Sequence, residues 1–118
     1  MEARFIVRQG DILLVRVKQL PQDAQPVQHG KDGIILALGE VTGHRHRIDS
    51  DPAAPVAQEY RAKKPVPVFD AVAERFIQVL EKAELRHEEH ATIHLPAGNY
   101  AVIQQREYFP EEIRNVTD

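Results

Sequence analysis

The sequence predicts a mainly β protein, a small single-domain barrel or sandwich of about six to eight short strands with two long loops and at most one short helix. Three observations support this fold class. Short apolar runs are rich in β-branched residues, glycine and proline separate these runs, and the 118 residues suit one domain spanning residues 1–118. An apolar fraction of 42% is that of a folded globular chain rather than a disordered one.

The first half of the chain reads as strands separated by long loops. In "GDILLVRV", residues 10–17, both alternating sets of side chains are mostly apolar, which predicts a strand buried on both faces. Residues 18–33 are rich in glutamine, proline and glycine and predict a long exposed loop. Residues 33–48 predict a strand, a break at Gly39 and a second extended piece, and residues 49–68, with four prolines, predict the second loop.

The second half contains one ambiguous segment. Residues 69–85 carry apolar side chains at helical spacing and many good helix formers, but "RFIQVL" also reads as a strand, with "KAELRH" beginning another. Further on, "ATIHL", a "PAGN" turn and "YAVIQQREY" predict a β-hairpin. In the tail, a short helical turn is expected after Pro110.

Composition excludes several classes of function. The chain has no cysteine, so disulfides, cysteine-ligated zinc and thiol nucleophiles are ruled out. A net charge of −3 makes nucleic acid an unlikely partner, and no apolar run reaches the roughly 18 residues of a membrane span. The amino-terminal residues do not form a signal peptide, so a cytoplasmic protein is expected. The sequence contains no G-x-S-x-G, phosphate-binding or dinucleotide-binding motif.

Five of the six histidines fall in two short windows, residues 44–46 and 87–94. His44 and His46 lie two apart in an extended segment, so they project from one face and can present two imidazoles to one metal ion. A third ligand would come from "HEEHATIH". If that segment is a strand, His90 and His94 share a face with Glu88; if it is helical, three histidines form one stripe. "HEEH" differs from the zinc-protease motif H-E-x-x-H because its histidines are three apart.

The leading hypothesis is a small metal- or ligand-binding β protein. Neutral imidazoles with a carboxylate suit zinc, nickel, iron or manganese, and a catalytic ion would act as a Lewis acid or activate water. Whether the protein is an enzyme stays open. The predicted metal site comprises His44, His46 and His90, with Glu88 and His94 in support.

A competing hypothesis comes from another class of function. Histidines on exposed strands are common, and Arg45 and Arg47 beside His46 resemble a solvated, charged face. The protein would then be a non-enzymatic accessory or adaptor module that binds a protein partner through a long loop or an exposed edge strand. A homodimer through such an edge and a small-molecule ligand are further possibilities.

Two resemblances add to this reading. "GHRHR" followed by "LPAGNY" resembles part of the cupin pattern, in which a His-x-His pair meets a histidine presented after a Pro-x-Gly turn. His44 and His46 match the pair, and Pro96 with Gly98 match the turn. The chain departs from cupins by lacking the glutamate after the pair and by having Ala101 after the turn, so His90 or His94 would have to substitute.

The second resemblance covers most of the second half. The segments GHxH, HEEH, LPxGxY and QREY are similar to those of a group of small, functionally uncharacterised bacterial and phage proteins. This resemblance implies no activity. It implies an extended conformation for residues 75–80 and so favours the strand over the helix.

Overall fold

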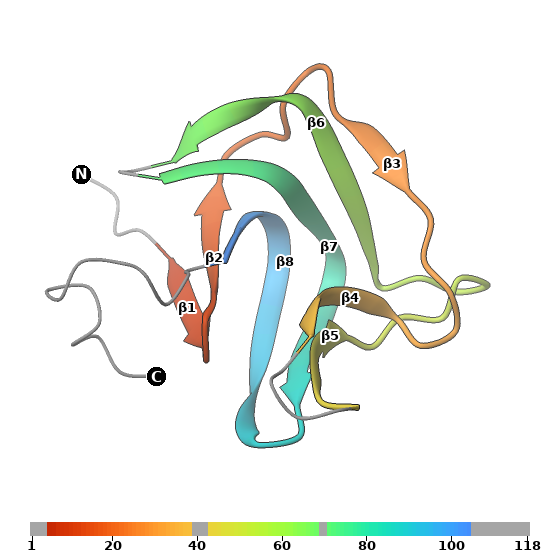
Figure 1. Ribbon diagram of the computed structural model, residues 1–118. Helices are drawn as coiled ribbons and strands as arrows, with labels where there is room; N and C mark the ends of the chain where they lie inside the picture. The colour runs from red at the N-terminus through yellow and green to blue at the C-terminus, as the bar shows by residue number, and fades with distance from the viewer. Residues whose placement is uncertain (1–4, 39–42, 69–70, 105–118) are drawn as a thin grey trace, which may run out of the picture.

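The computed structural model describes residues 5–38, 43–68 and 71–104, and none of these residues is helical. Accordingly, they include no helix that could cross a membrane. The strands pair antiparallel into one curved sheet (Figure 1). They are β1 (Ile6–Gln9), β2 (Ile12–Val17), β3 (Gln25–Val27), β4 (Ile34–Leu38), β5 (Arg45–Ile48), β6 (Ala57–Val68), β7 (Ala71–His87) and β8 (His90–Gln104).

This architecture confirms the predicted mainly β fold. The sheet runs β1-β2-β8-β7-β5-β4, with β6 also paired to β7 and β3 paired to β6. The described pairings leave the sheet open, so a closed barrel is not confirmed. The segment that is ambiguous in the sequence forms β7 over its described part, as the extended reading of "RFIQVL" implies.

The long hairpin of β7 and β8 organises the sheet, as Figure 1 shows. One side of β7 pairs with β8. On its other side β7 pairs with β6 at residues 71–79 and with β5 at Leu85 and Arg86. The carboxyl-terminal end of β7 therefore lies between β5 and β8, and the candidate site is located there.

Two apolar clusters stabilise the sheet. Ile12 and Leu14 of β2 pack with Tyr100 in the larger cluster, whereas Val15 packs with Phe76 in the smaller one. Neighbouring residues of β2 thus contribute to different clusters, because successive side chains of a strand point to opposite faces. The prediction of a strand buried on both faces is confirmed.

The structure forms a strand where the sequence predicts most of the second loop. Residues 57–68 make β6, although Pro65 and Pro67 lie in its second half. Strand β3 pairs with β6 only at Glu59–Arg61, so the proline-containing half has no partner on that side among the described residues. A proline without an N–H is tolerated at such an edge. The first predicted loop similarly contains the short strand β3.

The predicted "PAGN" turn is also replaced by strand. β8 continues from His90 to Gln104, and the chain reverses at Glu88 and Glu89 instead. Gly98 has a φ of +152°, a backbone conformation that residues with a side chain rarely adopt, and it lies beside the Arg16 guanidinium. The break at Gly39, the "QREY" segment and the helical turn after Pro110 lie outside the described residues.

Candidate functional site

Four imidazole rings contact one another at the end of the β7–β8 hairpin. We call His44, His46, His87 and His90 the imidazole group. Its ring centroids lie 4.3 Å apart for His46 and His87, 4.7 Å for His87 and His90, and 5.7 Å for His46 and His90. The ring of His44 reaches His87 at 5.8 Å. The structure therefore brings together three residues of the predicted set and adds His87, which that set omits.

Strand pairing explains why these rings meet. The two-residue turn at Glu88 and Glu89 makes His87 and His90 cross-strand partners, so both side chains project from one face. On the other side of β7, Arg47 pairs with Arg86. Continuing that register by one residue places His46 beside His87, and His46 is only 3% exposed.

Gln9 fixes the tautomer of His46. The Gln9 Nε2 donates to the carbonyl oxygens of Leu85 at 3.0 Å and Ala91 at 2.9 Å, which uses both of its hydrogens. The remaining amide oxygen, Oε1, lies 2.9 Å from His46 Nδ1. Because this oxygen can only accept, His46 must carry a proton on Nδ1. In the neutral ring the lone pair is then on Nε2.

The Nε2 of His46 faces a carboxylate. Asp11 Oδ1 lies 3.2 Å from this nitrogen. Burial lowers the pKa of His46 and the nearby His87 lowers it further, whereas Asp11 acts in the opposite direction without reversing the shift. A protonated His46 donates from Nε2 to this carboxylate, whereas in the neutral ring, which the lowered pKa favours, two hydrogen-bond acceptors face each other at this distance.

Gly10 leaves space beside the same nitrogen. Its φ of +59° is in the left-handed region, and a Cβ there would lie 3.0 Å from His90 Nε2 and 3.2 Å from His46 Nε2. Both nitrogens thus approach one point above the β1–β2 turn. The methyl group of an alanine at this position would crowd both rings, with His46 Cε1 only 2.9 Å away.

His87 has the opposite tautomer from His46. The backbone N–H of Glu89 donates to His87 Nδ1 at 3.0 Å, so this nitrogen has the lone pair and a neutral ring carries its proton on Nε2. Burial lowers the pKa of His87, with His90 as the next contribution, and both favour the neutral ring. His87 is therefore a hydrogen-bond donor at Nε2, where His46 is an acceptor.

Glu88 and His94 lie apart from the imidazole group. The Glu88 carboxylate accepts hydrogen bonds from the Arg45 backbone and the Arg47 guanidinium, each at 3.0 Å. The pKa of Glu88 is lowered chiefly by the Arg45 hydrogen bond. Within the imidazole group, His44 has its Nδ1 3.5 Å from Glu89 Oε1.

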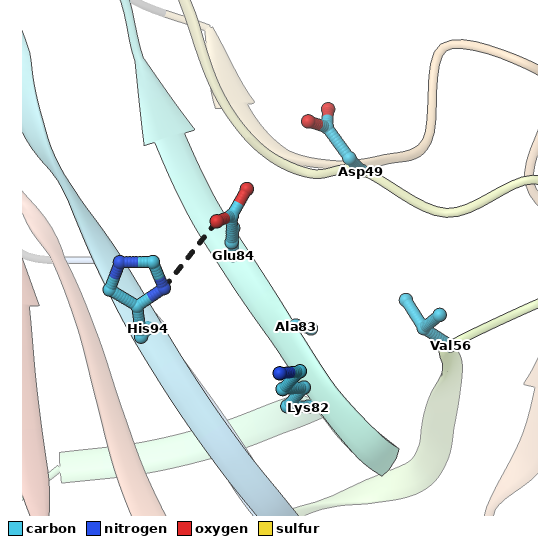
Figure 2. Close-up of a pocket in the computed structure, with 6 residues that line it drawn as sticks. All are labelled: Asp49, Val56, Lys82, Ala83, Glu84 and His94. Atoms are coloured by element: carbon cyan, nitrogen blue, oxygen red, sulfur yellow. Dashed lines mark ion pairs between the residues drawn. The ribbon is translucent and has the colours of Figure 1, made fainter.

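His94 lies on the other face of the sheet. Its cross-strand partner is Glu84, which precedes the inward-facing Leu85 in β7 and therefore points to the opposite face. The His94 side chain is 77% exposed. Figure 2 shows its Nδ1 directed at the Glu84 carboxylate, 3.4 Å away. Both residues border a hollow of about 320 Å³. The hollow is lined by Asp49, Val56, Lys82, Ala83, Glu84 and His94.

The imidazole group and Asp11 do not form a complete set of metal ligands among the described residues. Within residues 5–38, 43–68 and 71–104, no group of three or more histidine, aspartate or glutamate side chains forms a ready-made metal site. One pair does have suitable spacing. Ligand distances of about 2.0–2.1 Å around tetrahedral zinc place neighbouring donors roughly 3.3 Å apart. His46 Nε2 and Asp11 Oδ1 are 3.2 Å apart.

Sequence reasoning missed Gln9, Asp11 and His87. The available signal was the Gly-Asp pair before an apolar strand, which marks a turn but does not say what the turn approaches. His87 enters the group only because the chain reverses at Glu88 and Glu89. That position of the turn could not be read from propensity.

Fold and site together define a mainly β protein with an imidazole-rich group at one end of an open sheet. The chain belongs to a family described as a domain of unknown function (DUF8820), whose profile matches residues 8–105. Comparison with curated proteins found no match, and comparison with solved structures found none.

Proposed function

We propose that this protein binds a divalent transition-metal ion, with His46, His90 and Asp11 as its ligands. The observation that carries the proposal is the 3.2 Å separation of His46 Nε2 and Asp11 Oδ1, two acceptors facing each other. Gln9 removes the alternative tautomer of a neutral His46, because its oxygen requires a proton on Nδ1. A cation between the two acceptors turns an unfavourable contact into two bonds.

His90 supplies the third donor in this proposal. Its Nε2 lies against the same Gly10 position as His46 Nε2, and these two nitrogens are at most 6.2 Å apart, since they lie 3.0 and 3.2 Å from one point. Binding would draw His90 toward the other two donors. Two imidazoles and one carboxylate favour zinc, nickel or iron(II) and also accept manganese, and the three ligands leave a coordination position open. Such an ion acts as a Lewis acid or activates water.

This ligand set differs from the one expected from the sequence. It omits Glu88, whose carboxylate is engaged by Arg47, and His94, which pairs with Glu84 on the other face. It also omits His44, whose ring contacts His87 and whose Nδ1 lies near the Glu89 carboxylate. The His-x-His pair keeps its likeness to cupins, but the cupin's last histidine is replaced by Ala101, which is fully buried in the core.

The test is metal content and affinity of untagged protein. We expect about one zinc or other transition-metal ion per chain when protein is purified without chelator, measured by inductively coupled plasma mass spectrometry. The double variant His46→Ala/His90→Ala should lose it. His94→Ala is the matched control, because it removes an imidazole from the other face and should keep the metal.

Two further measurements complete the test. Circular dichroism establishes that each variant is folded, and zinc titration of chelator-treated protein gives the affinity. An equal metal content in all three proteins, or loss of metal from His94→Ala alone, would contradict the proposal. A metal-free, zinc-insensitive wild-type protein would instead favour the accessory module that binds a protein partner or a second copy of itself.

The GHxH and HEEH segments supply the imidazole group, so we propose that the bacterial and phage group with these segments shares the site. We also propose a cytoplasmic location, because a chain without cysteine has no need of an oxidising compartment.

A further inference from the structure

We propose that the hollow beside His94 binds a small aliphatic carboxylate, with Lys82 as its charged partner and Val56 as its apolar wall. This is the hollow of about 320 Å³ whose lining residues are drawn in Figure 2. Its β7 residue Glu84 points away from Leu85 and from the sheet face that carries the imidazole group. The proposal therefore does not depend on the metal site.

The two carboxylates that border the hollow are already engaged. Asp49 Oδ2 lies 2.7 Å from Arg86 Nε, and its Oδ1 lies 3.8 Å from Arg47 Nε. Glu84 has the Arg86 guanidinium at one oxygen and His94 Nδ1, 3.4 Å away, at the other. Each of these four carboxylate oxygens thus faces a nitrogen of the same chain, so neither acid is left to bind a cationic ligand.

Lys82 is the charge that remains. Within residues 5–38, 43–68 and 71–104, its ammonium group makes no hydrogen bond or ion pair. An exposed lysine alone is not a binding site, but Lys82 borders a hollow whose two acids are engaged, and Figure 2 shows it between His94 and Val56. The uncommitted charge is positive, so the hollow favours a ligand with a negative charge.

Val56 gives the hollow a fixed apolar wall. Its carbonyl oxygen accepts the Leu80 N–H at 2.8 Å, and its own N–H donates to Ser50 Oγ at 3.1 Å. Both polar groups of its backbone are satisfied, so the isopropyl group is what it offers to a ligand. That side chain also packs against the larger apolar cluster, which holds it in place.

The volume of the hollow limits the ligand to a small molecule. Sites for small ligands span about 300–1,000 Å³, and about 320 Å³ is at the lower end of that range. A carboxylate accepts a charge-assisted hydrogen bond from the Lys82 ammonium, and a short hydrocarbon chain can lie against Val56. Phosphate would use the charge without the valine, whereas an amine of equal length would use the valine without the charge.

The experiment follows the backbone amide signals of nitrogen-15-labelled, chelator-treated full chain by NMR during titration with butyrate. Butylamine and butanol have the same chain length without the negative charge, phosphate is an anion without the chain, and sodium chloride at equal ionic strength controls for screening. We expect saturable shifts at Val56, Ala83 and His94 with butyrate. Binding should tighten about two- to fourfold for each methylene from propionate to butyrate to pentanoate.

Variants of the two contact residues separate charge from apolar contact. Lys82→Met should weaken butyrate binding about fivefold or more, and Lys82→Arg should restore most of it. Val56→Ala should reduce the gain for each methylene. Lys64→Met is the matched control, because Lys64 is an exposed lysine of β6 that does not border the hollow, and it should bind butyrate like the wild type. Circular dichroism establishes that each variant is folded.

Several results would overturn the proposal. Shifts that are absent, do not saturate or persist unchanged in Lys82→Met would do so, as would shifts confined to the imidazole group. Butylamine binding as tightly as butyrate would show that the hollow does not select an anion, and tighter binding of phosphate would show that Val56 contributes nothing. A peptide with a free carboxyl terminus that binds more tightly than butyrate, while its amidated form does not bind, would replace the small acid with a chain end. None of these results bears on metal binding, because the protein is free of metal throughout.

Discussion

Replacing Arg75 with methionine should remove a contact between β7 and the strand β4 and destabilise the protein. The Arg75 guanidinium donates to the carbonyl oxygens of Leu36 and Ile35, both at 2.7 Å, and to the Glu59 carboxylate at 2.7 Å. β4 pairs with β5 on one side, and Arg75 binds backbone carbonyls of β4 from β7. One side chain thus satisfies two strand carbonyls and one carboxylate.

The expected loss of stability follows from what remains after the substitution. Glu59, whose side chain is 8% exposed, would keep a buried charge without its cation, and such a loss costs about 3–5 kcal/mol. Arg75 is 25% exposed, so water would reach part of the vacated space and the lower end, about 3 kcal/mol, is expected. That is a large part of the roughly 5–15 kcal/mol that stabilises an ordinary domain.

Urea unfolding followed by circular dichroism measures this loss. Arg61→Met is the matched control, because Arg61 is the cross-strand partner of Arg75 but lies exposed, and it should change stability by less than about 0.5 kcal/mol. Adding Glu59→Gln to Arg75→Met should recover part of the loss, since the unpaired charge is removed. A loss below about 1 kcal/mol for Arg75→Met would refute the reasoning.

Three further predictions concern the candidate site. Gln9→Met removes the partner that fixes the His46 tautomer, so zinc affinity should fall about 10- to 100-fold in a competition titration, and an unchanged affinity would contradict this role. Gly10→Ala and Gly43→Ala should each lower the free energy of unfolding, measured in urea, by about 1–2 kcal/mol, because both glycines have a left-handed φ. Only Gly10→Ala should also lose zinc binding, since a Cβ at Gly43 meets no atom within 4 Å. Burial lowers the pKa of His46 and His87 in the folded state, whereas an unfolded histidine keeps its ordinary pKa of 6.5. Below that pH the unfolded chain binds more protons than the folded one, so the stability of metal-free protein should fall as the pH is lowered through 6.5. A urea midpoint that stays flat from about pH 8 to 5 would count against this prediction.

The parts of the fold that alternation determines could be predicted from the sequence. The two apolar faces of β2 are visible in "ILLVRV" because a strand sends successive side chains to opposite sides. Residues 57–68 could not be assigned in this way. Their prolines indicate a loop, yet these prolines lie in the half of β6 that does not pair with β3. Which half of β6 stays unpaired on that side depends on how far β3 extends.

The candidate site was predicted in part, for a similar reason. The His-x-His spacing places His46 on one face whatever the sheet topology, so this residue could be chosen from the sequence. His87 depends on the position of a turn, and Asp11 depends on which hairpin ends beside β5. Gln9 looks like an ordinary polar residue in the sequence, although its amide is fully committed to three partners in the fold. Long-range register decides these contacts, and local pattern does not contain it.

The branched pairing of β7 has a consequence for how the site holds together. In the described residues, β5 pairs with β7 at only two positions, whereas β8 pairs with β7 along most of its length. The two halves of the imidazole group therefore belong to parts of the sheet with unequal resistance to opening, His46 on the lightly paired β4–β5 unit and His87 and His90 on the long hairpin. A fluctuation that lifts this unit would separate the donors while leaving the hairpin intact. An ion bound by both parts would join them as a crosslink, so occupancy of the site would set the frequency with which this end of the sheet opens.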